Sequence, residues 1–134
     1  MKKLLSLAMA ALLVLSICSY ALAASEGTPY YYTLSGGVNG KRNTAKVEKE
    51  STGAAENVVD YLSRTLADDE PVIMKVRYGA NGNPVTDGRD IFVEDTYYMA
   101  YTRNEGGVVG KTYYMKMQNT TGSEDVTVSG NFTP

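Results

Sequence analysis

Polar and apolar residues alternate along much of this chain with a period of two, which is the pattern of a β-strand buried on one side. Within 72–78, every second residue is large and apolar, and Lys75 and Arg77 stand between them. The same alternation runs through 111–118 and 126–132, and Gly-, Asn- and Asp-rich turns separate the segments. The pattern predicts an all-β fold, an antiparallel β-sandwich of about seven or eight short strands, because one open sheet would leave an apolar face in water.

The residues of the first turn predict a hairpin. Asn39-Gly40 is suited to the positive φ angles of a tight turn, so Tyr30–Leu34 is expected to pair with Arg42–Lys49. Charged side chains fall on both sides of Arg42–Lys49. Such charges discourage the addition of a strand from another chain, so this strand is predicted to be an exposed sheet edge.

A second predicted hairpin contains the candidate binding residues. A Gly-rich turn joins Tyr97–Arg103 to Lys111–Gln118, and alternation places Tyr98 and Tyr114 outward, beside Lys116. As neighbours on paired strands, the two tyrosines would form one exposed aromatic platform. The predicted binding residues are therefore Tyr98, Tyr114 and Lys116. The inward faces of the same hairpin are Tyr97, Met99, Tyr101, Tyr113, Met115 and Met117.

The segment 51–66 carries signals for both a helix and a strand. Five apolar residues share one helical face, Ser51 or Thr52 would cap the start and Pro71 lies beyond the end, which fits a short helix within 54–66. The strand interpretation rests on an alternating set, Val59, Tyr61, Ser63 and Thr65. These residues alone leave both interpretations open.

The first residues predict export from a bacterial cell. Lys2 and Lys3 precede a short apolar run, and small residues follow at Ala21 and Ala23, which is the pattern of a secretory signal peptide over 1–23. Bulky Ile17 before the single cysteine, Cys18, argues against a lipoprotein signal. We expect one domain over 24–134 that is secreted to the cell exterior or envelope, with no membrane span.

Composition excludes several classes of function. Without Lys2 and Lys3, the 13 basic residues become 11 against 15 acidic ones, a net charge of −4, which disfavours nucleic acid as a partner. There is no His and no Trp, and the one Cys lies in the predicted signal peptide. Catalytic sites built on His or Cys, and zinc sites, therefore lack their residues.

The acidic residues do not assemble into a recognisable site in the sequence. Carboxylates cluster at 68–70, 94–95 and 124–125, where predicted turns and strand ends keep them solvated rather than paired as in a glycosidase. The oxygen-rich loop 81–90 lacks the spacing of an EF-hand. We therefore expect neither an enzyme nor a metal ion or other cofactor.

The chain, chiefly in its C-terminal half, resembles a family of small secreted proteins of Bacillus-type bacteria whose function is unknown. The resemblance rests on Arg42-Asn43-Thr44, on Tyr98-Met99-Ala100-Tyr101, on the Asn-ended strand before Thr120 and on Val128-Ser129-Gly130-Asn131-Phe132. The tryptophans usual in that pattern are replaced here, with Phe132 in the last motif. The resemblance implies a β-sandwich-like fold with a strand around 58–65, and it assigns no catalytic residues.

Two functions fit these features. The first is a secreted, non-enzymatic binding module whose outward tyrosines contact an extracellular protein or a cell-surface glycan. The alternative is a secreted, bacteriocin-like antagonist that acts on other cells. Composition does not separate the two.

Secretion gives the first testable prediction. Because small residues occupy the predicted cleavage positions, intact-mass analysis of culture medium is expected to find a chain that begins at Ala24 or Ser25. The mass should not change on reduction, because Cys18 has been removed. Recovery of the full-length chain only from the cytosolic fraction would contradict the prediction.

Overall fold

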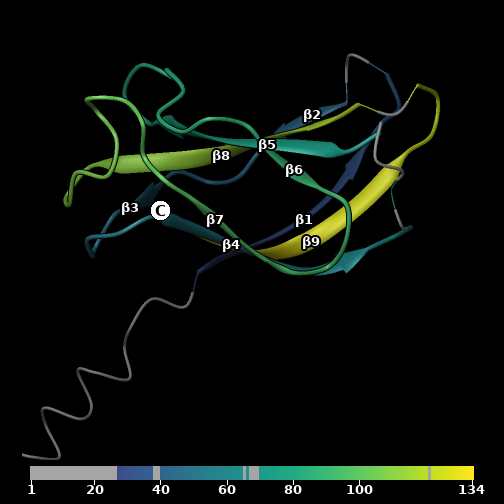
Figure 1. Cartoon of the computed structure of the whole chain (residues 1–134), viewed down its shortest axis with the longest axis horizontal. Coiled ribbons are helices and arrows are strands. Elements are labelled where there is room, and N and C mark those ends of the chain that lie inside the picture. The colour runs from purple at the N-terminus through teal and green to yellow at the C-terminus, as the bar shows by residue number, and fades with distance from the viewer. Residues whose placement is uncertain (1–26, 38–39, 65, 67–69, 121) are drawn as a thin grey trace, which may run out of the picture.

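The computed structural model describes residues 27–37, 40–64, 66, 70–120 and 122–134, and these form a β-sandwich (Figure 1). Sheet A has the strand order β1-β9-β4-β7, and sheet B has the order β2-β8-β5-β6, with β3 as a further partner of β8. The strands are β1 (Thr28–Leu34), β2 (Lys41–Asn43), β3 (Val47–Glu48), β4 (Ala55–Leu62), β5 (Val72–Tyr78), β6 (Arg89–Ile91), β7 (Thr96–Met99), β8 (Thr112–Asn119) and β9 (Val126–Thr133). The strand pairings are antiparallel, so the predicted fold class is confirmed.

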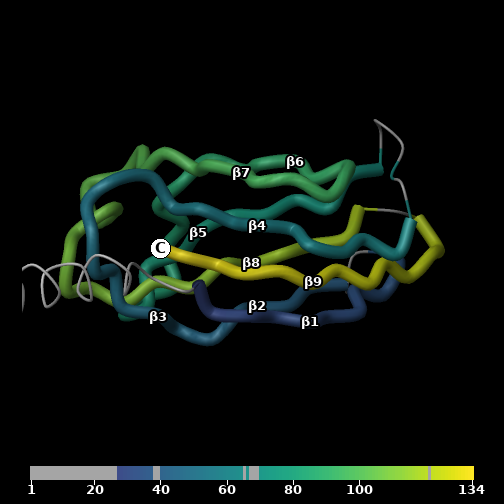
Figure 2. Tube along the Cα trace, turned by 90° about the horizontal axis from the view of Figure 1, so that it is seen from below, coloured from purple at the N-terminus to yellow at the C-terminus, as the bar shows by residue number. Residues whose placement is uncertain are grey.

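Most connections cross from one sheet to the other. Of the consecutive strands in the described residues, only β5 and β6 pair with each other. Figure 2 shows the result: the strands of sheet A follow one another in the order β7, β4, β9, β1, and those of sheet B in the matching order β6, β5, β8, β2. Strands that follow each other in the sequence therefore lie in opposite sheets more often than they pair within one sheet.

Both predicted hairpins are wrong for this reason. β1 pairs with β9 in sheet A, whereas 42–49 forms most of β2 and all of β3 in sheet B. Likewise β7 pairs with β4, whereas β8 pairs with β5. The segment after β7 does turn at 103–106, where the Gly106 amide donates to the carbonyl oxygen of Arg103 at 2.9 Å, but it leads from sheet A to sheet B. The prediction that 42–49 is a sheet edge is confirmed.

The core consists of the inward side chains of both sheets. Alternation predicted the buried faces of three strands correctly: Val72, Met74 and Val76 in β5, Tyr113, Met115 and Met117 in β8, and Val126, Val128 and Phe132 in β9. Tyr97 and Met99 are also buried, but Tyr101 lies beyond β7 and is only half-buried, with its ring 5.4 Å from that of Tyr113. At Gly130 a Cβ atom would stand 1.9 Å from the carbonyl oxygen of Val58, so glycine is required there.

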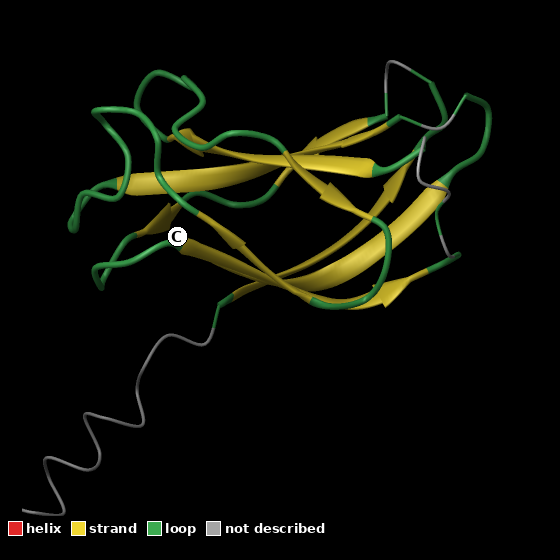
Figure 3. Ribbon diagram, viewed as in Figure 1, coloured by secondary structure: helices red, strands yellow, loops and turns green. Residues whose placement is uncertain are grey.

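The ambiguous segment is a strand. β4 covers 55–62, and Figure 3 shows strands and loops but no helix in the described part of the chain, so the helix interpretation of 54–66 is wrong. Within the same described residues, nothing forms a helix long and apolar enough to cross a membrane. The predicted signal peptide 1–23, Asn39, Thr65, Asp68 and Asp69 lie outside the described residues.

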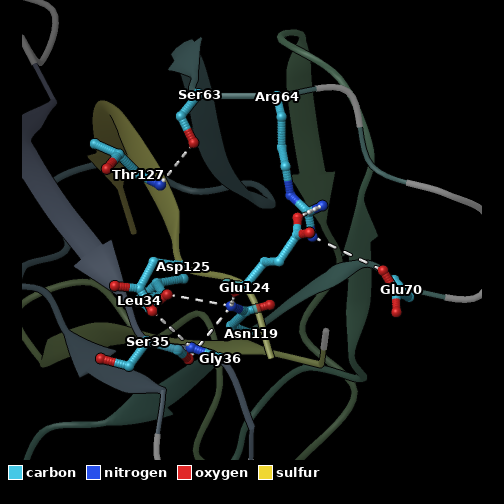
Figure 4. A network of polar contacts seen from close by, with 10 residues as sticks. All are labelled: Leu34, Ser35, Gly36, Ser63, Arg64, Glu70, Asn119, Glu124, Asp125 and Thr127. Carbon is cyan, nitrogen blue, oxygen red and sulfur yellow. Dashed lines mark hydrogen bonds and ion pairs between the residues drawn. The ribbon is translucent and has the colours of Figure 1, made fainter. Parts of the chain in front are cut away.

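A buried asparagine joins the two sheets at one end of the sandwich (Figure 4). Asn119 ends β8 in sheet B, and its side-chain Nδ2 donates hydrogen bonds to the carbonyl oxygens of Leu34, at 3.1 Å, and Ser35, at 3.3 Å, where β1 of sheet A ends. The same nitrogen donates to the carbonyl oxygen of Glu124, at 2.8 Å, in the turn before β9. Asn119 thus links the end of β8 in sheet B to the end of β1 and to the turn before β9 in sheet A.

Removal of a core ring tests the assignment of inward faces. Phe132 is fully buried, so Phe132→Ala is expected to reduce the free energy of unfolding by about 3 to 5 kcal/mol. Ser129 lies on the opposite side of β9, so Ser129→Ala should change it by less than about 0.5 kcal/mol. Urea titration measures both, and similar losses would contradict the assigned faces.

The Asn119 contacts give a pH-dependent prediction. Asn119→Asp replaces a donor by a carboxylate that faces carbonyl oxygens, which is expected to cost about 3 kcal/mol or more near pH 7. Burial raises the pKa of the introduced carboxyl above its unfolded value of about 3.9, so the folded state binds more protons. The variant should therefore regain stability as the pH falls, as urea titrations at several pH values would show. A loss that does not depend on pH would contradict this account.

Candidate functional site

The outer face of sheet A carries exposed tyrosines in register. Tyr31 of β1 and Tyr61 of β4 both lie opposite Ser129 of β9, the strand between them. Direct cross-strand neighbours point to the same side of a sheet, so the two rings flank the small serine with their Cα atoms about 10 Å apart, twice the strand spacing. Tyr31 is 69% exposed and Tyr61 is 46% exposed. The row Tyr31–Ser129–Tyr61 therefore presents two aromatic rings to solvent.

A β-bulge places Tyr61 on this face. The register of β4 against β9 shifts between Val59 and Tyr61, so Asp60 is an extra residue. Without the bulge, Tyr61 would share the inward side of Val59. The Nδ2 atom of Asn131 in β9 donates a hydrogen bond to Asp60 Oδ2 at 3.2 Å, which ties the bulge residue to the neighbouring strand.

Tyr98 lies on the same outer face, on the edge strand β7. It is 62% exposed and stands opposite Glu56 of β4, whose carboxylate raises the pKa of Tyr98. Its position is about 13 Å farther along the strands than the row of Tyr61. We call the outer face around Tyr31, Tyr61 and Tyr98 the tyrosine face.

Charge is distributed unequally between the two sheets. The strands of sheet A contain two acidic residues, Glu56 and Asp60, and no Lys or Arg. The strands of sheet B contain two acidic residues, Glu48 and Asp90, and six basic ones: Lys41, Arg42, Lys75, Arg77, Arg89 and Lys116. The tyrosine face is thus free of strand cations, whereas sheet B concentrates them.

The other two predicted site residues lie on sheet B. Tyr114 and Lys116 are half-buried on the outer side of β8, opposite Arg77 and Lys75 of β5. Burial, together with the charges of Arg77 and Lys41, lowers the pKa of Lys116. We call the outer face of sheet B around Lys41, Lys75, Arg77 and Lys116 the basic face.

The predicted aromatic platform of Tyr98 and Tyr114 does not form. Tyr98 is on the outer face of sheet A and Tyr114 is on the outer face of sheet B, so they face opposite directions. The outward orientation of each was predicted correctly, but their adjacency was wrong because β7 and β8 do not pair. Tyr98 instead shares the outer face of sheet A with Tyr31 and Tyr61, and this grouping was missed. No local pattern joins residues so far apart in the sequence.

The acidic residues in the described part of the chain mostly support the fold. Glu94 accepts a hydrogen bond from the backbone of Leu62, at 2.9 Å, and Asp125 from that of Gly36, at 3.0 Å. Glu124 forms an ion pair with Arg64 (Figure 4). Among the described residues, no group of three or more His, Cys, Asp or Glu side chains is placed to hold a metal ion.

One lysine is buried at the end of the core. Lys49 packs beneath the loop after β7, with its ammonium group 4.9 Å from the centre of the Tyr101 ring. Burial lowers the pKa of Lys49 and raises that of Tyr101. The Tyr101 ring in turn contacts Gly106 and Gly107, so this cluster holds the loop against the core.

Comparisons of the chain with protein-family models, with curated proteins and with solved structures found no match. The resemblance to the Bacillus-type secreted family therefore remains a prediction from its motifs.

Proposed function

We propose that this protein is a secreted, non-enzymatic binding module that holds a neutral cell-surface glycan on its tyrosine face. The observation that carries the proposal is the row Tyr31–Ser129–Tyr61, in which two exposed rings flank a small polar residue. The signal pattern of 1–23 supports secretion.

The chemistry of the face favours sugar rings. Pyranose rings have an apolar C–H face that stacks on an aromatic ring, and the spacing of Tyr31 and Tyr61 suits alternate rings of an extended oligosaccharide. Short hydroxyl and amide side chains from β1 and β9 lie on either side of the row, namely Thr33, Thr127 and Asn131, in addition to Ser129 within it. These groups both donate and accept hydrogen bonds, as sugar hydroxyls require.

The charge and shape of the face narrow the ligand class. The charged strand residues here, Glu56 and Asp60, are acidic, so an anionic ligand would be repelled and a neutral one is favoured. A protein partner would bury a closely packed apolar centre. Here the centre of the row is Ser129, which suits a glycan better.

Loss of the two rings tests the proposal. The double variant Tyr31→Ser with Tyr61→Ser should reduce retention on purified cell walls or neutral polysaccharide about tenfold, since each stacked ring contributes roughly 0.5 to 1.5 kcal/mol. Stability should change little, because both rings are exposed. Affinity electrophoresis and urea titration measure the two effects.

Two control variants sharpen this test. Val109→Ser removes an exposed apolar side chain far from the row and should leave retention unchanged. Ser129→Gln keeps both tyrosines but fills the space between them, so it should weaken binding about as much as the loss of one ring. Equal retention by the wild type and the double variant would overturn the proposal. Killing of indicator cells without any retention on glycans would favour the bacteriocin-like alternative.

A further inference from the structure

Two lysines stand directly opposite each other in the centre of the basic face. Lys75 of β5 pairs in register with Lys116 of β8, so their side chains share the outer side of sheet B. Like charges at directly opposed positions destabilise a sheet. Arg77 follows Lys75 by two positions and points to the same side. The pair is therefore an unfavourable arrangement for folding alone.

These cations have no carboxylate partner. Within the described residues, the ion pairs join Arg64 to Glu70 and Glu124, and Arg103 to Asp87. None of them includes a basic residue of the basic face. Asp90 stands opposite Ile73 on the same face, two residues from Lys75 along β5, and Glu48 stands opposite Thr112, but neither forms one of these ion pairs. The four cations of the basic face thus outnumber the acidic strand residues beside them and form none of the ion pairs of the described residues.

Polar groups and a shallow hollow accompany the charge. A cavity of about 130 Å³ is lined by Ile73, Lys75, Arg77, Lys116 and Gln118. Tyr114 lies beside it on β8, opposite Arg77. Lys41 of β2 stands opposite Gln118 of β8, and Arg77 of β5 stands opposite Tyr114. These two cations are therefore separated by two strand spacings across the sheet and by four residues along β8, a distance of about 15 Å.

We propose that the basic face binds a second ligand, a linear acidic polysaccharide whose carboxylates lie against Lys41, Lys75, Lys116 and Arg77. Charge complementarity selects an anion. The length of the face selects a polymer, because a single small anion would reach only one or two of the cations. The site lies on the opposite side of the sandwich from the tyrosine face and does not depend on the function proposed there.

The interleaved side chains favour a sugar polymer over nucleic acid. Tyr114 and Gln118 alternate with Lys116 along β8 and can bond sugar hydroxyls. Four cations on a protein of net negative charge suit a polymer with about one charge per sugar ring. Nucleic acid carries a higher charge density, and its binders have a basic overall balance.

Titration of the purified protein with polygalacturonate tests the proposal. Saturable binding is expected at low ionic strength and should weaken as salt is added. Lys75→Gln and Lys116→Gln should each weaken it about two- to fivefold. Lys111→Gln removes an equal charge from an exposed position outside the basic face and should change it by less than about twofold.

A charge reversal separates binding from folding. Lys75→Glu replaces the opposed lysines by an attractive pair with Lys116, so the urea midpoint should rise while polygalacturonate binding falls further than in Lys75→Gln. Loss of binding with a lowered midpoint would instead indicate damage to the fold and would overturn the assignment.

Three further measurements complete the test. The double variant Tyr31→Ser with Tyr61→Ser should bind polygalacturonate as the wild type does, which keeps this site distinct from the tyrosine face. Neutral dextran should not compete for the basic face. Double-stranded DNA that binds as tightly as polygalacturonate, with the same response to Lys75→Gln, would overturn the polysaccharide assignment. So would the absence of binding at low salt.

Discussion

Burial of one side of every long strand between the two sheets is the constraint on which the rest of the structure depends. β5, β8 and β9 each direct alternate side chains into a common core, and β4 does so on both sides of its bulge, at Val59 and Leu62. Because strand side chains alternate, the remaining positions are forced outward. Both candidate binding surfaces are these outward positions. A change in register by one residue would exchange core and surface at once.

Local pattern predicted the strands and their faces, but it did not predict their partners. Val72, Met74 and Val76 were assigned inward from alternation alone, and they are fully buried. Which strands pair depends on contacts between residues that are far apart in the sequence, and here most connections cross from one sheet to the other. A Gly-rich turn such as 104–107 looks the same in a hairpin as in a loop that packs over Tyr101. The predicted platform of Tyr98 and Tyr114 is wrong because it assumed that this turn joins two paired strands.

The tyrosine row shows why the site was harder to predict than the fold. Its three members come from β1, β4 and β9, and only the completed sheet brings them together. The bulge at Asp60 also reverses the side on which Tyr61 lies, which simple alternation does not reveal. By contrast, the unequal charge of the two sheets was present in the strand sequences. It became a feature of the surface only when the strands were assigned to layers.

The pairing of β1 with β9 has a consequence for how the chain acquires its structure. β9 also lies between β1 and β4, so these two strands join one sheet only when the last strand is available. Contacts between segments so distant in the sequence form slowly, because a long loop must close first. Sheet A is therefore expected to form late in folding, and a chain cut before Val126 would leave β1 without its partner strand.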